Sequence, residues 1–372
     1  MVRPVAPLWL ARPSRFAALD HRSARIVAGI AALLLVLGLA TLAVPPAPVD
    51  VTGTSAVADD RDDAAAYDTI VEAVRHGADY YAVTIQEIRR ADLPLPSFTA
   101  VRLPTLSVVQ AQVPAPATLA LLYALVATVA VAWFVRLRDG LPRRRPRLLA
   151  ILLLLAGVAP VVQEASAVAH EAWAGLLVAL SLAVRRPGQA TAAIALALCA
   201  MLIRETAAIY AVVMLVAAML GKRRREALGW VAALAVFGVA LGVHAQAVAA
   251  VVGTFDPAAP DWGGLSGPGT VLRLMALSTA LAVVPAWIAL PLATLALLGW
   301  AAWRDPLGLR VLATVAACGG AMALVAHDDG ARWAMLVAPV LLVGLIFAPD
   351  ATRDLWRAAH ARRRITVTRT AR

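Results

Sequence analysis

Long apolar runs separated by short charged segments form the main pattern of the chain. A transmembrane helix needs roughly 20 mostly apolar residues to cross a hydrocarbon core of about 30 Å. The run 189–220 is too long for one crossing and has basic residues at both ends, so we divide it at Arg204-Glu205. The pattern predicts an all-α integral membrane protein with about ten transmembrane helices, near 26–44, 115–135, 148–163, 165–184, 189–203, 206–220, 228–252, 280–303, 309–326 and 333–348.

The distribution of charge predicts how these helices are oriented. Most of the 34 Lys and Arg residues lie at the chain ends and in alternate connections, whereas most of the 23 acids lie in the other connections. Basic loops favour the cytoplasm. We therefore expect a multi-pass protein with both termini in the cytoplasm, divided into a basic N-terminal tail (1–25), a transmembrane domain (26–348) with an extracytoplasmic loop (45–114), and a basic C-terminal tail (349–372).

The composition agrees with a membrane protein, because 61% of the residues are hydrophobic and the mean hydropathy is +0.77. The net charge of +11 does not indicate a nucleic-acid partner, since the basic residues occupy short connections between apolar runs. The two cysteines, Cys199 and Cys318, lie within apolar runs and have no metal-ligand spacing.

The loop 45–114 is predicted to be structured. Apolar residues from Tyr67 to Val74 recur at helical spacing, and Gly77 is placed to end that helix. A second stripe begins at Tyr80. We expect two amphipathic helices that lie on the outer membrane surface.

Four acids, Asp59, Asp60, Asp62 and Asp63, precede Tyr67. One interpretation is structural, because an Asp such as Asp62 or Asp63 can cap the N-terminus of a helix. The other is catalytic, because a carboxylate near a membrane surface can act as a general base. The residues alone leave both interpretations open.

Further ionisable residues belong to the same predicted side of the membrane, where such groups usually face a cavity or a partner. Two pairs of these residues also have a purely structural interpretation. His170-Glu171 can be a solvated helix end, and Arg204-Glu205 can be a turn in which the two residues pair with each other. Because all of these ionisable residues fall on the same predicted side of the membrane, a functional site is favoured. The members of this set are Arg102, His170, Glu171, Arg204, Glu205 and Arg332, the last preceded by His327-Asp328-Asp329.

Two stretches, "DDAAAYDTIVEAVRHGADYY" (62–81) and "PLPSFTAVRLPTL" (94–106), resemble bacterial polytopic glycosyltransferases of the GT-C fold. The resemblance covers about 50 residues. It implies an extracytoplasmic, inverting sugar transfer from a polyprenyl-phosphate donor in a bacterial inner (cytoplasmic) membrane. Its spacing to Tyr67 favours Asp63 as the base and then Asp62. The chain departs from the family pattern because four acids compete for this place, some way beyond the first span.

The resulting hypothesis assigns Asp63 and Asp62 to catalysis and seven residues to substrate binding: Tyr67, Arg102, His170, Glu171, Arg204, Glu205 and Arg332. Arginine suits a donor phosphate because its fork can bind two oxygens. No metal site is assigned, although an acid pair could hold Mg²⁺ or Mn²⁺. The acceptor is a glycan, lipid or protein. The alternatives are a transporter or flippase for lipid-linked sugars and a non-catalytic membrane subunit.

Overall fold

The computed structural model consists of helices, and the part of the chain that it describes contains no β-strand. The predicted all-α fold is therefore confirmed. The described residues are 7–43, 56–90, 101–162, 169–253, 265–325 and 330–360.

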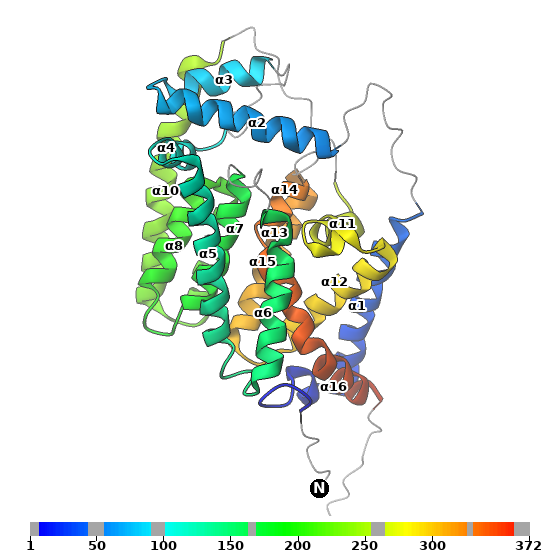
Figure 1. The fold of residues 1–372 in the computed structure, drawn as a ribbon. Coiled ribbons are helices and arrows are strands. Elements are labelled where there is room, and N and C mark those ends of the chain that lie inside the picture. Colours follow the sequence, from blue (N-terminus) through cyan, green and yellow to red (C-terminus); the bar gives the residue numbers. More distant parts are fainter. Residues whose placement is uncertain are drawn as a thin grey trace, which may run out of the picture.

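A bundle of near-parallel helices forms the body of the molecule (Figure 1). Within the described residues, four helices are long and apolar enough to cross a membrane, which supports a helical membrane protein. The other predicted spans are shorter or interrupted, so ten crossings are not confirmed. The four long helices are α1 (His21–Ala40), α5 (Ala115–Arg136), α10 (Arg224–Val251) and α13 (Pro306–Val325). The shorter ones are α6 (Arg144–Val158), α7 (His170–Val184), α8 (Thr191–Ile203), α9 (Ala208–Leu220), α11 (Pro268–Leu277) and α12 (Ala286–Ala302).

The last predicted span, 333–348, is not one continuous helix. It is divided into α14, α15 and the 3-10 helix η6, which pack against α6, α7 and α12. Glycines allow this close packing, because a Cβ added to Gly157, Gly175 or Gly299 would collide with backbone atoms of the divided segment. The segment thus lies in the bundle interior as α14 (Gly330–Met335), α15 (Ala338–Leu341) and η6 (Leu342–Phe347).

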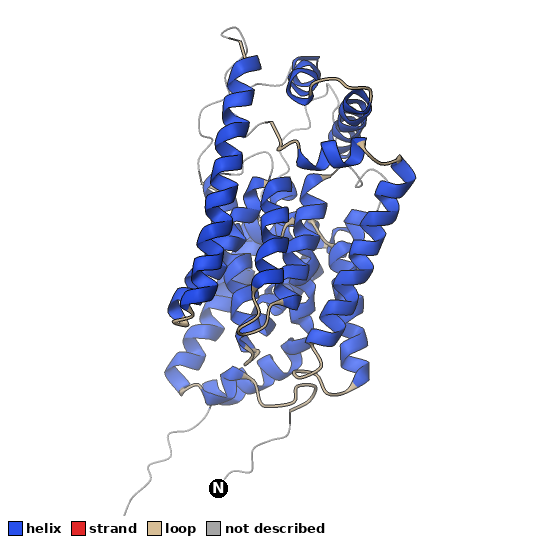
Figure 2. Cartoon of the chain, turned by 90° about the vertical axis from the view of Figure 1, so that its left-hand side faces the viewer, coloured by secondary structure: helices blue, strands red, loops and turns tan. Residues whose placement is uncertain are grey.

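Three helices of the predicted outer loop form a layer over one end of the bundle. Two of them, α2 and α3, lie across the long helices in Figure 1, and Figure 2 shows two helices above the bundle nearly end-on. Helix α10 reaches this layer and packs against α3. Helices α2 and α3 match the two that the sequence predicts, and α4 was not predicted. The layer comprises α2 (Ala56–Arg75), α3 (Tyr80–Arg90) and α4 (Thr105–Ala111).

The start of α2 corrects one interpretation of the acids. Because α2 begins at Ala56, the backbone of Asp62 and Asp63 lies inside the helix and neither residue is its N-cap. The predicted end is confirmed, since Gly77 follows the helix with φ +91°, a conformation that favours glycine.

The first described residues, from 7 onward, and the last described helix meet at the opposite end of the bundle (Figure 1). Residues 348–360 form helix α16 (Ala348–His360), which packs against α1 and α12. The fully buried Asp350 carboxylate accepts hydrogen bonds of 2.7 to 3.1 Å from three consecutive backbone N–H groups, those of Leu8, Trp9 and Leu10. Asp354 accepts from the Ser14 backbone N–H at 3.0 Å. Part of each predicted tail is therefore packed structure.

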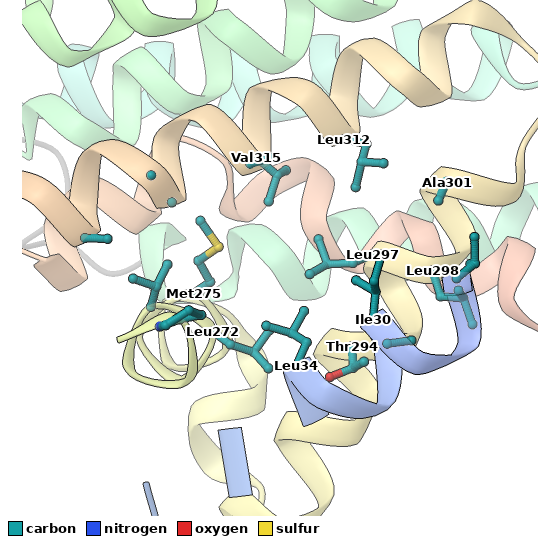
Figure 3. A pocket seen from close by; sticks show the side chains of 18 residues that line it. Ile30, Leu34, Leu272, Met275, Thr294, Leu297, Leu298, Ala301, Leu312 and Val315 are labelled. Atoms are coloured by element: carbon teal, nitrogen blue, oxygen red, sulfur yellow. The ribbon is translucent and has the colours of Figure 1, made fainter. Parts of the chain in front are cut away.

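An apolar cavity of about 460 Å³ lies between α1, α11, α12 and α13. Figure 3 shows that its labelled side chains are aliphatic apart from Met275 and Thr294. Such a cavity offers no polar anchor except the Thr294 hydroxyl, which already donates to the Leu290 carbonyl at 2.9 Å. It suits a hydrocarbon chain.

Candidate functional site

A cluster of four charged side chains, three of them buried, lies beneath the surface layer, which is the layer of α2, α3 and α4. Arg102 Nη2 and Arg204 Nε each lie 3.1 Å from the same oxygen, Oε1 of Glu171. Arg204 Nη1 also donates to Oε1 of Glu205 at 2.6 Å. The side chains of Arg102, Arg204 and Glu171 are 9%, 5% and 3% exposed, so water screens this cluster little.

Three segments that are distant in sequence bring these charges together. Arg102 lies in the stretch that leads into α4, Glu171 lies in the first turn of α7, and Arg204 ends α8. The extended backbone of Arg204 (φ −141°, ψ 117°) separates α8 from the short helix η4 (Glu205–Ala207), which continues into α9. The predicted division of 189–220 at this point is therefore confirmed.

Two rings extend the cluster toward the surface layer. The Arg102 guanidinium lies over the Tyr67 ring, 4.8 Å from its centroid, which is a cation–π contact. The Tyr67 and His170 rings are 5.2 Å apart. Tyr67 is half-buried on α2, so the surface helix contributes one wall of the site.

The backbone that carries Arg102 is held by side chains from α3 and α10. Tyr80 donates its hydroxyl to the Arg102 carbonyl at 2.8 Å, and His244 Nε2 lies 3.0 Å from the Val101 carbonyl. A carbonyl can only accept, so Nε2 of His244 carries a proton, and Nδ1 of the same ring lies 3.2 Å from Tyr81 Oη. Burial raises the pKa of both tyrosines, so both hydroxyls stay protonated and can donate at neutral pH.

Arg75 fixes α2 onto α4. Its guanidinium donates to the carbonyls of Gln110, Ala111 and Val113 at 3.2, 3.4 and 3.0 Å. These carbonyls lie at the C-terminal end of α4, where helical partners are missing. The contact fixes the helix that carries Tyr67 relative to the segment that follows Arg102.

The central ion pairs are close in distance but poorly aligned. Among the described residues, Glu171 Oε1 and Arg204 Nε have no partner with hydrogen-bond geometry. A buried charge without aligned partners is costly, and such groups mark places where a ligand or water completes the network. Each guanidinium carries five N–H donors, so Arg204 can hold two carboxylates and still donate to a ligand oxygen. The arrangement can bind an oxyanion beside Glu171.

The structure brings together six of the nine predicted site residues: Tyr67, Arg102, His170, Glu171, Arg204 and Glu205. Arg332 is half-buried on α14, which packs against α7, the helix that carries His170 and Glu171. Asp62 and Asp63 lie on the backbone of α2 ahead of Tyr67, but their side chains lie outside the described residues, as do residues 327–329.

The residues that hold the 101–102 backbone were not predicted from the sequence. His244 is a lone histidine in a strongly apolar run, and an ionisable residue in such a run was a usable signal. Tyr80 and Tyr81 were assigned to an amphipathic stripe, and the positioning role of their hydroxyls had no sequence signal.

Within the described ranges, no group of three or more His, Cys, Asp or Glu residues is arranged to hold a metal ion. Comparison of the chain with protein-family models, curated proteins and solved structures finds no match in any of the three.

Proposed function

We propose that this protein is a membrane glycosyltransferase that moves a sugar from a polyprenyl-phosphate donor to an acceptor hydroxyl outside the cytoplasm. The observation that carries the proposal is the contact of Arg102 and Arg204 with one buried oxygen of Glu171, next to the helix that bears the acid cluster. Two guanidiniums at one point suit a phosphate, because arginine is planar and always charged.

The proposed reaction is a single displacement. A carboxylate of α2, Asp63 by preference and otherwise Asp62, takes the proton of the acceptor hydroxyl, whose oxygen bonds to the anomeric carbon. The bond between that carbon and the donor phosphate oxygen breaks through an oxocarbenium-like state, and the configuration inverts. Arg102 and Arg204 stabilise the charge on the leaving phosphate.

The remaining cluster residues have positioning roles in this proposal. Glu171 holds both guanidiniums at one place, and Glu205 orients Arg204. Tyr67 stacks on Arg102 and His170 lies against Tyr67, so both shape the entrance from the surface layer. Arg332 is a further candidate for the phosphate, since α14 packs against α7.

The apolar cavity supports a lipid-linked donor. Nucleotide sugars stay in the cytoplasm, so an outward-facing transferase needs a donor whose hydrocarbon chain carries the sugar through the membrane. A cavity of about 460 Å³ between α1, α11, α12 and α13 can accept part of such a chain. The acceptor remains a glycan, a lipid or a protein.

Radiolabel transfer tests the activity directly. Membranes with the protein should move labelled sugar from a polyprenyl-phosphate donor to endogenous acceptor, and membranes without it should not. The Asp63→Asn protein at equal abundance is the control. Protein-dependent movement of the intact donor across sealed vesicles, without sugar transfer, would contradict the proposal and favour a flippase.

The orientation that we propose places both termini in the cytoplasm of a bacterial inner membrane. Single cysteines test it, in a protein whose Cys199 and Cys318 have been replaced by Ala. A cysteine at the exposed position His76 should react with an impermeant thiol reagent added outside, and one at the exposed position Asp139 should not. Reaction at Asp139 together with silence at His76 would invert the topology.

A further inference from the structure

A second cavity, of about 520 Å³, lies at the end of the bundle opposite the charged cluster, where the segment around Trp9 packs against α16. Three consecutive arginines line it together with one aromatic and two apolar residues. The lining comprises Trp9, Arg143, Arg144, Arg145, Pro146 and Leu149. In Figure 1 the N-terminal segment loops beside this end of α6.

The cavity has an uncompensated positive charge. Among the described residues, no carboxylate forms an ion pair with Arg143, Arg144 or Arg145. Two acids at this end have other partners, since Asp350 accepts from Arg353 at 2.9 Å and Asp305 accepts from Arg136 at 2.9 Å. The arginines therefore attract an anion.

One wall of the cavity is fixed before any ligand binds. The Asp350 carboxylate holds the backbone N–H groups on both sides of Trp9 as well as its own. Arg143 Nη1 donates to the Leu8 carbonyl at 3.1 Å, which ties the arginine run to the same segment. Trp9 and the arginines thus keep a defined spacing, and a prearranged site costs less ordering entropy on binding.

An apolar stripe continues from the cavity along α6. Leu148, Leu149, Leu152 and Leu155 are 47%, 39%, 62% and 38% exposed, and their spacing places them along one side of the helix. In a membrane protein such a stripe faces hydrocarbon. A ligand that meets both features has an anionic group and a long apolar chain.

We infer that this cavity binds the headgroup of an anionic phospholipid, with the lipid chains along the leucine stripe of α6. Arginine forks match phosphate oxygens, and basic pockets between transmembrane helices are known binding sites for anionic lipids. Trp9 suits the level of the headgroups, where indole rings gather. A soluble phosphate compound has the same anionic chemistry, but it would not use the stripe.

The test measures lipid binding by the purified full-length protein in detergent, using native mass spectrometry during titration with phosphatidylglycerol or with phosphatidylcholine. We expect selective retention of phosphatidylglycerol. The R144Q/R145Q variant should bind it at least tenfold more weakly. The matched control R224Q/R225Q makes the same charge change at two exposed arginines, the first two residues of α10, and should bind normally. Equal affinities in the two variants would overturn the inference.

Two further arms separate the remaining explanations. R144K/R145K keeps both positive charges, so the fold and the orientation of the protein in the membrane should not change. It lacks the guanidinium groups that can bind two phosphate oxygens at once. It should bind phosphatidylglycerol about threefold more weakly, and unchanged affinity would contradict the site. Glycerol 1-phosphate should not raise the melting temperature, whereas a rise equal to that from phosphatidylglycerol would replace the lipid by a soluble phosphate. These outcomes do not bear on the proposed transferase activity.

Discussion

The described residues include two Arg–Glu–Arg triads, each with a buried glutamate, one at each end of the bundle. At the layered end, Glu171 lies between Arg102 and Arg204. At the other end, Glu226 lies between Arg185 and Arg223. The two glutamate side chains are similarly buried, 3% and 6% exposed. Because each triad consists of two arginines and one glutamate, the two ends allow a controlled comparison.

The triads differ in how well their hydrogen bonds are made. Arg185 binds Glu226 through both oxygens, from Nε to Oε1 at 3.0 Å and from Nη2 to Oε2 at 2.7 Å, and Arg223 Nε donates to Oε2 at 2.7 Å. In the layered end both arginines approach a single oxygen of Glu171 without hydrogen-bond alignment. A fully paired triad fixes the ends of α7 and α10, whereas a partly paired one has donors and acceptors that a ligand can satisfy.

The largest expected effect is on stability, in the fully paired triad. Glu226→Gln removes the charge that Arg185 and Arg223 share and leaves Arg185 buried without a counterion. Breaking a buried ion pair on one side typically costs several kcal/mol. Since the Arg223 side chain is 29% exposed and can rehydrate, we expect a loss near the lower end, about 3 kcal/mol. Chemical unfolding in detergent micelles measures it.

The control for this prediction is Asp139→Asn, which removes one exposed acid at the same end of the bundle. It should leave the free energy of unfolding unchanged. Glu226→Gln protein that remains folded should keep its transfer activity. Normal stability together with lost transfer would reverse the roles that we assign to the two triads.

The second effect concerns catalysis at the layered end. Asp63→Asn keeps the size of the side chain but removes the basic oxygen, so sugar transfer should fall by about a hundredfold or more, the scale of general-base effects. Melting in detergent should not change. Because α2 begins at Ala56, the loss of a helix cap cannot account for such a fall.

Asp59→Asn and Asp60→Asn are the matched controls on the same helix, and both should transfer normally. If Asp63→Asn lowers sugar transfer only slightly, a large fall in transfer for Asp62→Asn would identify Asp62 as the base. Full activity in both the Asp62→Asn and the Asp63→Asn proteins would remove the acids of α2 from the mechanism and leave the Glu171 triad as a binding site only.

Much of this comparison was accessible from the sequence. The apolar helices and the helices α2 and α3 follow from local periodicity. The expectation that Arg102, Glu171 and Arg204 share one side of the membrane follows from the side on which basic loops fall. These are one-dimensional signals, and they selected six residues that do meet in space. The triad around Glu226 was not predicted, because the charges in the connections between helices entered the prediction only through the expected orientation of those helices.

The partners of the charged side chains and the division of the run 333–348 into short helices could not be predicted, because both depend on three-dimensional packing. The sequence offered Glu205 as the neighbour of Arg204, and nothing in it indicated that Arg204 also contacts Glu171. The run 333–348 is apolar throughout, so its hydropathy predicts a span. Its division into α14, α15 and η6 is accompanied by close contacts with glycines of α6, α7 and α12, which hydropathy does not register.

The third effect separates charge from geometry. Arg102→Lys keeps the charge beside Glu171 but loses the fork, so donor binding should weaken by about tenfold, the scale of one hydrogen bond to a charged group. The expected signature is a raised KM for the donor in the transfer assay. Arg223→Lys is the matched change in the other triad and should leave KM unchanged. If Arg102→Lys transfers normally, Arg102 is a structural partner of Glu171 and does not bind the donor phosphate.

The smallest effect concerns the ring that covers Arg102. A cation–π contact at a partly exposed position is worth about 0.5–1 kcal/mol, so Tyr67→Leu should weaken donor binding by about two- to fivefold. Tyr67→Phe keeps the ring face and should bind almost normally, because the contact uses the ring and not the hydroxyl. The pair of variants therefore separates stacking from hydrogen bonding. At the other end of the bundle, Arg136 lies 6.0 Å from the centroid of Trp303, which is itself packed on Phe347, so Trp303→Leu should lower the melting temperature and leave the KM for the donor unchanged. If Tyr67→Leu also lowers the melting temperature and leaves the KM for the donor unchanged, the ring of Tyr67 stabilises the fold and does not contribute to donor binding.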